Sequence, residues 1–192
     1  MKTYSPFKSL ALIAMLTLTQ VFALAAPPLL PQANFSLRSV DGTTVSSTGT
    51  RGKVIVLAVG ALWLPLSRTQ VQGVQKLADT YSGRDVEVYW VSTDSESHKS
   101  KNYASDDQLR EFAAKYDLKV KVLRDPDGQT SKELGADQVP ALIIIDKQGN
   151  VSGNPIGGLN AQGNIVRTTR IQTDQTALMP QQHNPYKKRG DA

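Results

Sequence analysis

Cysteine is absent from this chain: none of its 192 residues carries a thiol. The absence excludes disulfide bonds, thiolate metal sites, cysteine nucleophiles and lipid attachment through cysteine. Histidine is scarce too, with only His98 and His183. A lone loop histidine such as His98 is more often inert than a metal ligand. We therefore predict no bound metal and no cofactor.

Long hydrophobic runs are also scarce. The one clear run covers residues 10–26, follows Lys2 and Lys8, and contains the small-x-small pattern Ala23-Leu24-Ala25 near its end. This layout is typical of a secretory signal peptide, and the run is short for a membrane span of about 20 residues. We predict a signal peptide over residues 1–25, with an uncleaved anchor as the alternative. The mature protein would be periplasmic or extracellular, with no stable membrane span.

A basic binding face is not evident either, although the net charge is +5. The excess lies at the two ends of the chain, and the stretch from Ala26 to Val166 is neutral by direct count. Nucleic-acid binding needs a basic stripe on the folded body, so we do not expect it. Residues 167–192 are polar and basic with few apolar positions, which predicts a flexible tail.

What the chain does contain is an alternation of strand and helix patterns between a proline-rich linker, residues 26–33, and the tail. Apolar and β-branched runs predict strands, and apolar residues at helical spacing predict helices. We expect strands over 33–38, 43–45, 53–60, 85–93, 119–123, 141–146 and onward from 151, and helices over 65–82, 105–116 and 131–134. This order predicts one α/β domain over residues 34–166 with a mixed sheet.

The remaining polar and aromatic candidates have ordinary structural interpretations. Asp125, Asp127 and Asp146 lie in turns or at a strand end, without the spacing of a calcium loop. Gly157-Gly158 lacks a phosphate-loop pattern and predicts a turn. Tyr89 and Trp90 fall on a strand and are expected in the core or on a sheet face.

Four segments in order resemble the thioredoxin-fold redoxin superfamily, which includes thiol-disulfide oxidoreductases, TlpA-like proteins and the alkyl hydroperoxide reductase C/thiol-specific antioxidant (AhpC/TSA) group. They are Phe35-Ser36-Leu37 with Asp41-Gly42-Thr43-Thr44-Val45, Gly52–Leu57 leading into Ala61–Arg68, Val139–Asp146, and Lys147–Val151. The resemblance covers roughly residues 34–166. It implies a thioredoxin-like fold: a central mixed β-sheet flanked by helices, with an N-terminal β-hairpin extension.

The second segment departs from the family at two positions. The family has Trp-Cys-Pro-Pro-Cys-Arg where this chain has Trp63-Leu64-Pro65-Leu66-Ser67-Arg68. The resemblance therefore places Leu64 and Ser67 at the two cysteine positions. Leu64 offers no nucleophile, and a serine hydroxyl needs an activating base. Thiol redox chemistry starts from a thiolate, and copper delivery by related metallochaperones needs a cysteine pair, so both are excluded.

The resemblance also implies a peptide-binding surface. In the family, the residue before a cis-proline pairs its backbone with an extended peptide, and Val139 and Pro140 occupy those positions. Our candidate binding residues are Trp63, Leu64, Pro65, Ser67, Arg68, Val139 and Pro140. Apolar side chains would then replace the reactive thiol, and such a patch often marks an interaction site. The alternative is that Leu64 only packs against the loop.

Two functional hypotheses follow from these observations. The first is an exported, redox-inactive thioredoxin-fold protein that binds a peptide, an envelope protein or another copy of itself. The second is a thiol-disulfide oxidoreductase or peroxiredoxin-type antioxidant, as the family resemblance alone implies, for which this chain offers no chemically competent nucleophile.

Overall fold

The computed structural model describes residues 31–157. The predicted signal peptide and basic tail, and the end of the predicted domain, lie outside this range. Within it, the last residues of the predicted linker are already attached to the fold. Gln32 bridges Asn150, and the Ala33 amide donates to the Gly149 carbonyl at 2.9 Å. Ala33 is buried, so the domain begins a few residues earlier than its sequence pattern suggests.

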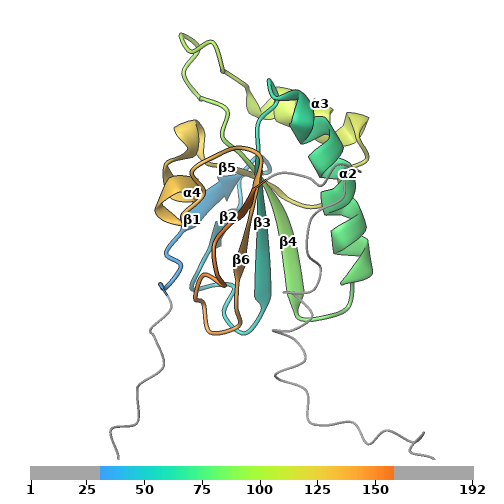
Figure 1. Ribbon diagram of the computed structural model, residues 1–192. Coiled ribbons are helices and arrows are strands. Elements are labelled where there is room, and N and C mark those ends of the chain that lie inside the picture. The colour runs from blue at the N-terminus through green and yellow to red at the C-terminus, as the bar shows by residue number, and fades with distance from the viewer. Residues whose placement is uncertain (1–30, 158–192) are drawn as a thin grey trace, which may run out of the picture.

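A single mixed sheet forms the centre of the domain, with strand order β2-β1-β5-β4-β3-β6-β7 (Figure 1). β4 runs parallel to β3 and β5, and every other neighbouring pair is antiparallel. The strands are β1 (Ser36–Ser39), β2 (Thr44–Ser46), β3 (Val54–Gly60), β4 (Val86–Ser92), β5 (Val122–Arg124), β6 (Ala141–Ile145) and β7 (Ile156–Gly157). β1 and β2 form the expected N-terminal hairpin.

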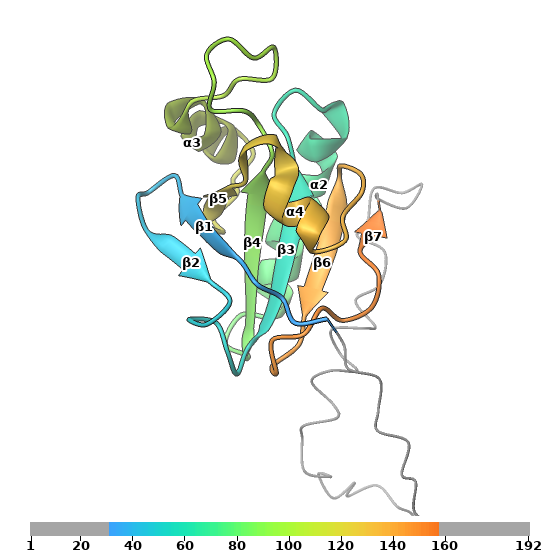
Figure 2. The same cartoon turned by 90° about the vertical axis from the view of Figure 1, so that its left-hand side faces the viewer.

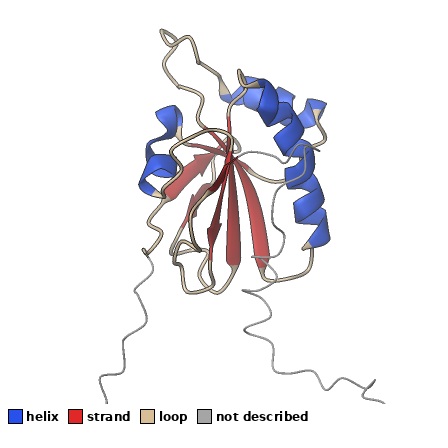
Figure 3. Ribbon diagram, viewed as in Figure 1, coloured by secondary structure: helices blue, strands red, loops and turns tan. Residues whose placement is uncertain are grey.

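Helices cover both faces of the sheet (Figure 3). They are α2 (Pro65–Thr80), α3 (Asp106–Lys115), the 3-10 turn η1 (Pro126–Gly128) and α4 (Gln129–Glu133). Figure 2 shows α4 in front of the strands, on the face opposite α2 and α3. This confirms the predicted α/β architecture.

β3 is an interior strand between β4 and β6, and every one of its residues is buried. Its side chains alternate between two apolar cores. Val54, Val56 and Ala58 pack with α2 and α3, whereas Ile55, Leu57 and Val59 face the core under α4. A β-branched apolar run of this kind is what a strand covered on both faces requires. Tyr89 and Trp90 are buried in these cores, as their strand position predicts.

The helix starts follow local sequence signals. Ser105 caps α3 in a capping box: its hydroxyl accepts from the Gln108 amide at 3.1 Å, and the Gln108 side chain accepts from the Ser105 amide at 2.8 Å. α2 has no side-chain cap and begins with Pro65 instead. Proline suits the first turn, since its missing N–H would have no partner inside the helix.

The last part of the chain differs from its prediction. Val151 forms only an isolated bridge to Ile145, and the return strand begins at Ile156. Gly153 has a positive φ, and Pro155 lacks an amide proton, so the intervening segment cannot continue the ladder. Gly157 is a strand residue rather than part of a turn. The short helix predicted over 131–134 begins two residues earlier and ends one residue earlier, at Gln129–Glu133.

The helices of residues 31–157 include none that is both long and apolar enough to cross a membrane.

Candidate functional site

The candidate site lies where β3 ends and α2 begins. Leu64 is the N-cap of α2 and is half-buried, whereas Pro65 and Arg68 are exposed. Trp63 and Leu66 are large apolar side chains that remain 53% exposed. Apolar side chains therefore reach solvent at the start of the helix, beside the position where the family resemblance places the first cysteine.

Ser67 stands at the second cysteine position and is completely buried. Its Oγ accepts a hydrogen bond from the Ala61 amide at 2.9 Å. No histidine or carboxylate within residues 31–157 is hydrogen-bonded to this hydroxyl. Ser67 therefore fixes the turn into α2, and it has no general base and no access to a peptide on the surface.

A group of buried neutral polar side chains, which we call the neutral cluster, lies behind the motif and consists of Ser67, Gln70 and Trp90. The Gln70 amide nitrogen donates to the carbonyls of Val59 (3.1 Å) and Ala141 (3.2 Å), and its oxygen accepts from Trp90 Nε1 (3.3 Å). Gln70 thereby ties α2 to the ends of β3 and β6.

Gly60 lets the neutral cluster approach the backbone of β3. A Cβ on this residue would lie 2.8 Å from Gln70 Oε1, 2.8 Å from Trp90 Nε1 and 2.9 Å from Ser67 Oγ. Only glycine leaves enough room, so Gly60 is required by packing and not by a positive φ.

The Val139–Pro140 peptide bond is cis, as the family resemblance implies. Within residues 31–157, neither the amide nor the carbonyl of Val139 has a backbone hydrogen-bond partner. Pro140 itself is buried, and Val139 is half-buried. Val139 and Trp63 line the same pocket of about 260 Å³. The structure therefore brings the two parts of the predicted surface together through Trp63 and Val139.

Asp94 holds the loop that carries Trp63. Its carboxylate accepts from the Leu62 amide at 2.9 Å and from the Ser92 hydroxyl at 2.8 Å. Burial raises the pKa of the Asp94 carboxyl above its ordinary value, although these hydrogen bonds and the positive charge of Arg124 act in the opposite direction. These hydrogen bonds reduce the free-energy cost of burying the carboxylate.

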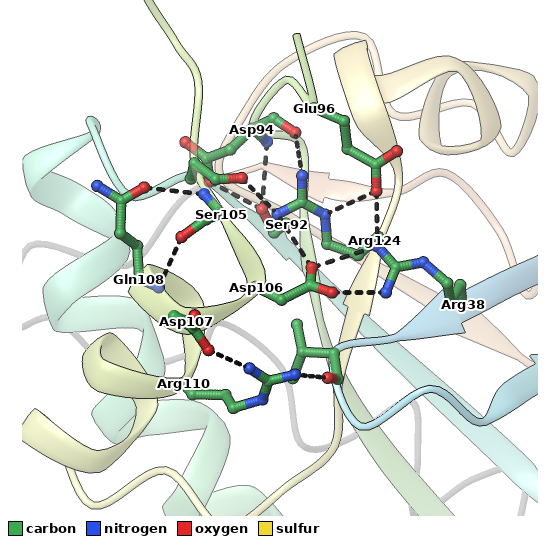
Figure 4. Close-up of polar contacts among 12 residues, drawn as sticks. Arg38, Ser92, Asp94, Glu96, Ser105, Asp106, Asp107, Gln108, Arg110 and Arg124 are labelled. Atoms are coloured by element: carbon green, nitrogen blue, oxygen red, sulfur yellow. Dashed lines mark hydrogen bonds and ion pairs between the residues drawn. The ribbon is translucent and has the colours of Figure 1, made fainter. Parts of the chain in front are cut away.

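A second network, which we call the charged cluster, consists of Arg38, Glu96, Asp106 and Arg124 (Figure 4). Arg38 donates to Asp106 at 2.7 Å and to Glu96 at 2.8 Å, and these two hydrogen bonds raise the pKa of Arg38. The same hydrogen bond from Arg38 is the main reason that the pKa of Asp106 is lowered. The cluster joins β1 and β5 to α3 and to the loop after β4.

Arg124 is the buried member of the charged cluster, with 3% of its surface exposed. Its guanidinium donates to the carbonyl of Ala104 at 2.9 Å and to that of Asp94 at 3.4 Å. Its Nε lies 3.4 Å from the Glu96 carboxylate without a hydrogen bond. Arg124 thus supports the backbone of Asp94, which in turn holds Leu62 next to Trp63.

The other polar candidates have local roles. The carboxylate of Asp125 accepts from the Thr130 and Ser131 amides at 2.9 and 2.7 Å, and Asp146 accepts from the Asn150 amide at 2.8 Å. The His98 ring lies against Tyr103, with centroids 4.1 Å apart. Residues 31–157 contain no group of three or more side chains able to hold a metal ion.

Sequence reasoning did not find Gln70, Asp94 or Arg124. Gln70 precedes Val71 on the buried stripe of α2, where a polar residue among apolar ones could have signalled a buried hydrogen bond. Arg124 continues the apolar strand of β5 and carried a similar signal. Their partners are distant in sequence, so only the fold identifies them.

The sheet order, the hairpin, the cis-proline beside the start of α2 and the helices on both faces define a thioredoxin-like fold. A family model described as the AhpC/TSA family matches residues 30–153, and the chain belongs to that family. It is 27% identical over 124 residues to the thioredoxin-like protein YneN of Bacillus subtilis, covering 65% of this chain and 68% of the relative.

Two solved structures illustrate the same fold. A putative thiol:disulfide interchange protein DsbE from Chlorobium tepidum aligns with a TM-score of 0.60 at 22% identity, over 77% of this chain and 95% of its own. The exposed lipoprotein thioredoxin Etrx1 of Streptococcus pneumoniae aligns with a TM-score of 0.56 at 25% identity, over 75% and 99% of the two chains.

Proposed function

We propose that this chain is an exported thioredoxin-fold protein that binds an extended peptide of an envelope protein and carries out no thiol redox chemistry. The observation that carries the proposal is the pairing of Trp63 with Val139 across one pocket, next to a helix start at which Leu64 and Ser67 replace the expected cysteines. The binding surface of the fold is retained, while its reactive group is missing.

The backbone of Val139 supports the mode of binding. Its amide and carbonyl have no backbone partner within the described residues, and Val139 lines the pocket. An extended peptide would form main-chain hydrogen bonds there, in the manner of strand addition. Trp63, which is 53% exposed, and Leu64, which is half-buried, would supply apolar contact.

Two observations support export. The first 25 residues have the layout of a signal peptide. One structural relative is an exposed lipoprotein at 25% identity. We infer a periplasmic or extracellular location, where the peptide partner would be an envelope protein.

The alternative function is the oxidoreductase activity that the family relationship suggests. The purified protein should neither reduce insulin nor consume hydrogen peroxide above a heat-inactivated control. The double variant Leu64→Cys/Ser67→Cys is the matched comparison, because it restores a thiol pair at the start of α2, where a helix N-terminus lowers a thiol pKa. We expect dithiothreitol-dependent insulin reduction only from this variant. Turnover by the wild type would contradict the redox-inactive proposal.

The binding proposal is tested with a degenerate pool of cysteine-free nonapeptides, titrated calorimetrically into the purified protein. Leu64→Glu should weaken binding at least tenfold, because it places a charge in the apolar contact. Leu66→Glu is the matched control, because it makes the same substitution two residues later, in the first turn of α2. Equal loss in both variants would place the peptide on the helix start rather than beside Pro140. Unchanged binding in both would contradict the proposed surface.

A further inference from the structure

The pocket beside the cis-proline has walls from five segments of the chain. Trp63 comes from the loop before α2, Asn102 from the loop after β4, Asp127 from η1, and Lys132 from α4, while Asp137 and Val139 precede β6. Trp63 and Val139 contribute large apolar side chains to the lining, and the segment 127–137 contributes charged ones.

The charges of this pocket are unbalanced. It is lined by two carboxylates, Asp127 and Asp137, and by one ammonium group, Lys132. Within residues 31–157 none of the three forms an ion pair with another side chain. All three are exposed. The two carboxylates can therefore bind a cation from solution or from a ligand, and the pocket lining carries a net negative charge.

Trp63 adds a second feature that favours a cation. Its indole is 53% exposed and lines the pocket. Tryptophan is the aromatic side chain that attracts ammonium and guanidinium groups most strongly, through the negative face of its ring. Asn102 and Gln138 add neutral hydrogen-bonding groups to the lining.

The volume limits the size of the occupant. Sites for drug-sized small molecules usually enclose about 300–1,000 Å³. The volume here is about 260 Å³, which is smaller and suits one long side chain. Because Val139 lines it, a side chain in this pocket would belong to a peptide paired with that residue.

We propose that the pocket is a subsite for a basic side chain, arginine or lysine, of the bound peptide. The guanidinium or ammonium group lies over the Trp63 ring and pairs with Asp127 and Asp137. This inference rests on the proposed peptide-binding function and adds the chemical class of the residue that is recognised.

The test uses three degenerate cysteine-free nonapeptide pools that are identical except at a fixed central residue: arginine, its neutral isostere citrulline, or glutamate. Calorimetric titration of the full chain should show about tenfold tighter binding of the arginine pool than of the citrulline pool, and the weakest binding for glutamate. The double variant Asp127→Asn/Asp137→Asn should remove most of the preference for arginine over citrulline.

Asp117→Asn is the matched control. Asp117 and Asp127 are both exposed aspartates with positive φ, 51° and 62°, but only Asp127 lines the pocket. The control should retain the full arginine preference. Unfolding midpoints of the variants in urea separate loss of binding from loss of folding.

The outcomes distinguish the subsite from the function on which it rests. Equal binding of arginine and citrulline pools overturns the subsite and leaves the peptide-binding function intact. Preference for glutamate also overturns it, in favour of an anion held by Lys132. If no pool binds, the peptide-binding function itself is wrong, and the subsite with it.

Discussion

The neutral cluster and the charged cluster stabilise the same loop by different means. Ser67 and Gln70 hydrogen-bond backbone groups behind α2, and Gln70 also accepts from Trp90, so this cluster has no charged member. Arg38, Glu96, Asp106 and Arg124 link β1 and β5 to the loop after β4 through ion pairs. One network is complete without ionisation, whereas the other depends on the charge of each member.

The difference has a consequence for the site. The position that would hold the second cysteine now belongs to a network whose hydrogen bonds have no titratable donor or acceptor. Its contribution to stability should therefore be nearly independent of pH between about 3 and 9. The charged cluster supports Asp94, and through Asp94 the Leu62 amide next to Trp63. Any pH dependence in the stability of this loop should therefore come from the charged cluster and Asp94, and not from the neutral cluster.

Replacing Arg124 should have the largest effect on stability. Arg124→Met leaves the carbonyls of Asp94 and Ala104 without their donor and removes the buried positive charge beside Asp94, which should cost about 3–5 kcal/mol of unfolding free energy. Urea denaturation measures this. Arg38→Met is the control, because Arg38 contacts two of the same carboxylates from a side chain that is 44% exposed.

Exposed ion pairs contribute about 0–1 kcal/mol, so the Arg38 variant should remain close to the wild type. Similar losses in the two variants would mean that burial does not distinguish the two arginines. The comparison between the clusters would then fail.

Gly60→Ala should have the next largest effect, and it acts on the neutral cluster. The added methyl group would lie within 2.9 Å of polar atoms of all three cluster members, which must shift. Overpacking of this kind costs about 1–3 kcal/mol. Gly49→Ala is the control: Gly49 also lacks a positive φ, but its nearest neighbour would lie 3.4 Å away. A Gly60 variant as stable as the Gly49 variant would show that the cluster is loosely packed.

The two clusters also mark where sequence reasoning succeeds and fails in this chain. The apolar run of β3 and the capping box of α3 are signals between near neighbours, so both elements are predictable. The cis bond before Pro140 follows from the family resemblance. In contrast, the burial of Arg124 depends on Glu96 and Asp106, and the role of Gln70 depends on Ala141. Such pairs form only after the strands have assembled.

The surface beside Pro140 was only partly predictable for the same reason. Trp63 and Val139 meet at one pocket, but Ser67 is buried and held by Ala61. The sequence alone does not show that a serine at a surface motif points inward. Nor does it bring Asp127 and Asp137 to the same pocket, because the turn at η1 and the segment before β6 are brought together by α4.

The smallest effect should be the pH dependence of the charged cluster. The hydrogen bond from Arg38 holds the pKa of Asp106 below its ordinary value. A carboxyl group with a lowered pKa contributes stability above the pKa of the unfolded state, about 3.9, and this contribution is lost as the pH falls through the folded-state pKa. Asp106→Asn should therefore lower stability at pH 6, by less than about 1 kcal/mol, and this difference from the wild type should shrink as the pH falls below the unfolded-state pKa of about 3.9.

Asp107→Asn is the matched control for this pH series, because it is the next residue in the first turn of α3 and its side chain is 85% exposed. Urea midpoints measured from pH 3 to pH 7 compare both variants with the wild type. Burial raises the pKa of Asp94, so its contribution has the opposite sign and is lost as the pH rises through its folded-state pKa. An Asp106→Asn curve that stays parallel to the wild type down to pH 3 would show that the ion pair with Arg38 does not stabilise the fold, and the charged cluster would then differ from the neutral one in position only.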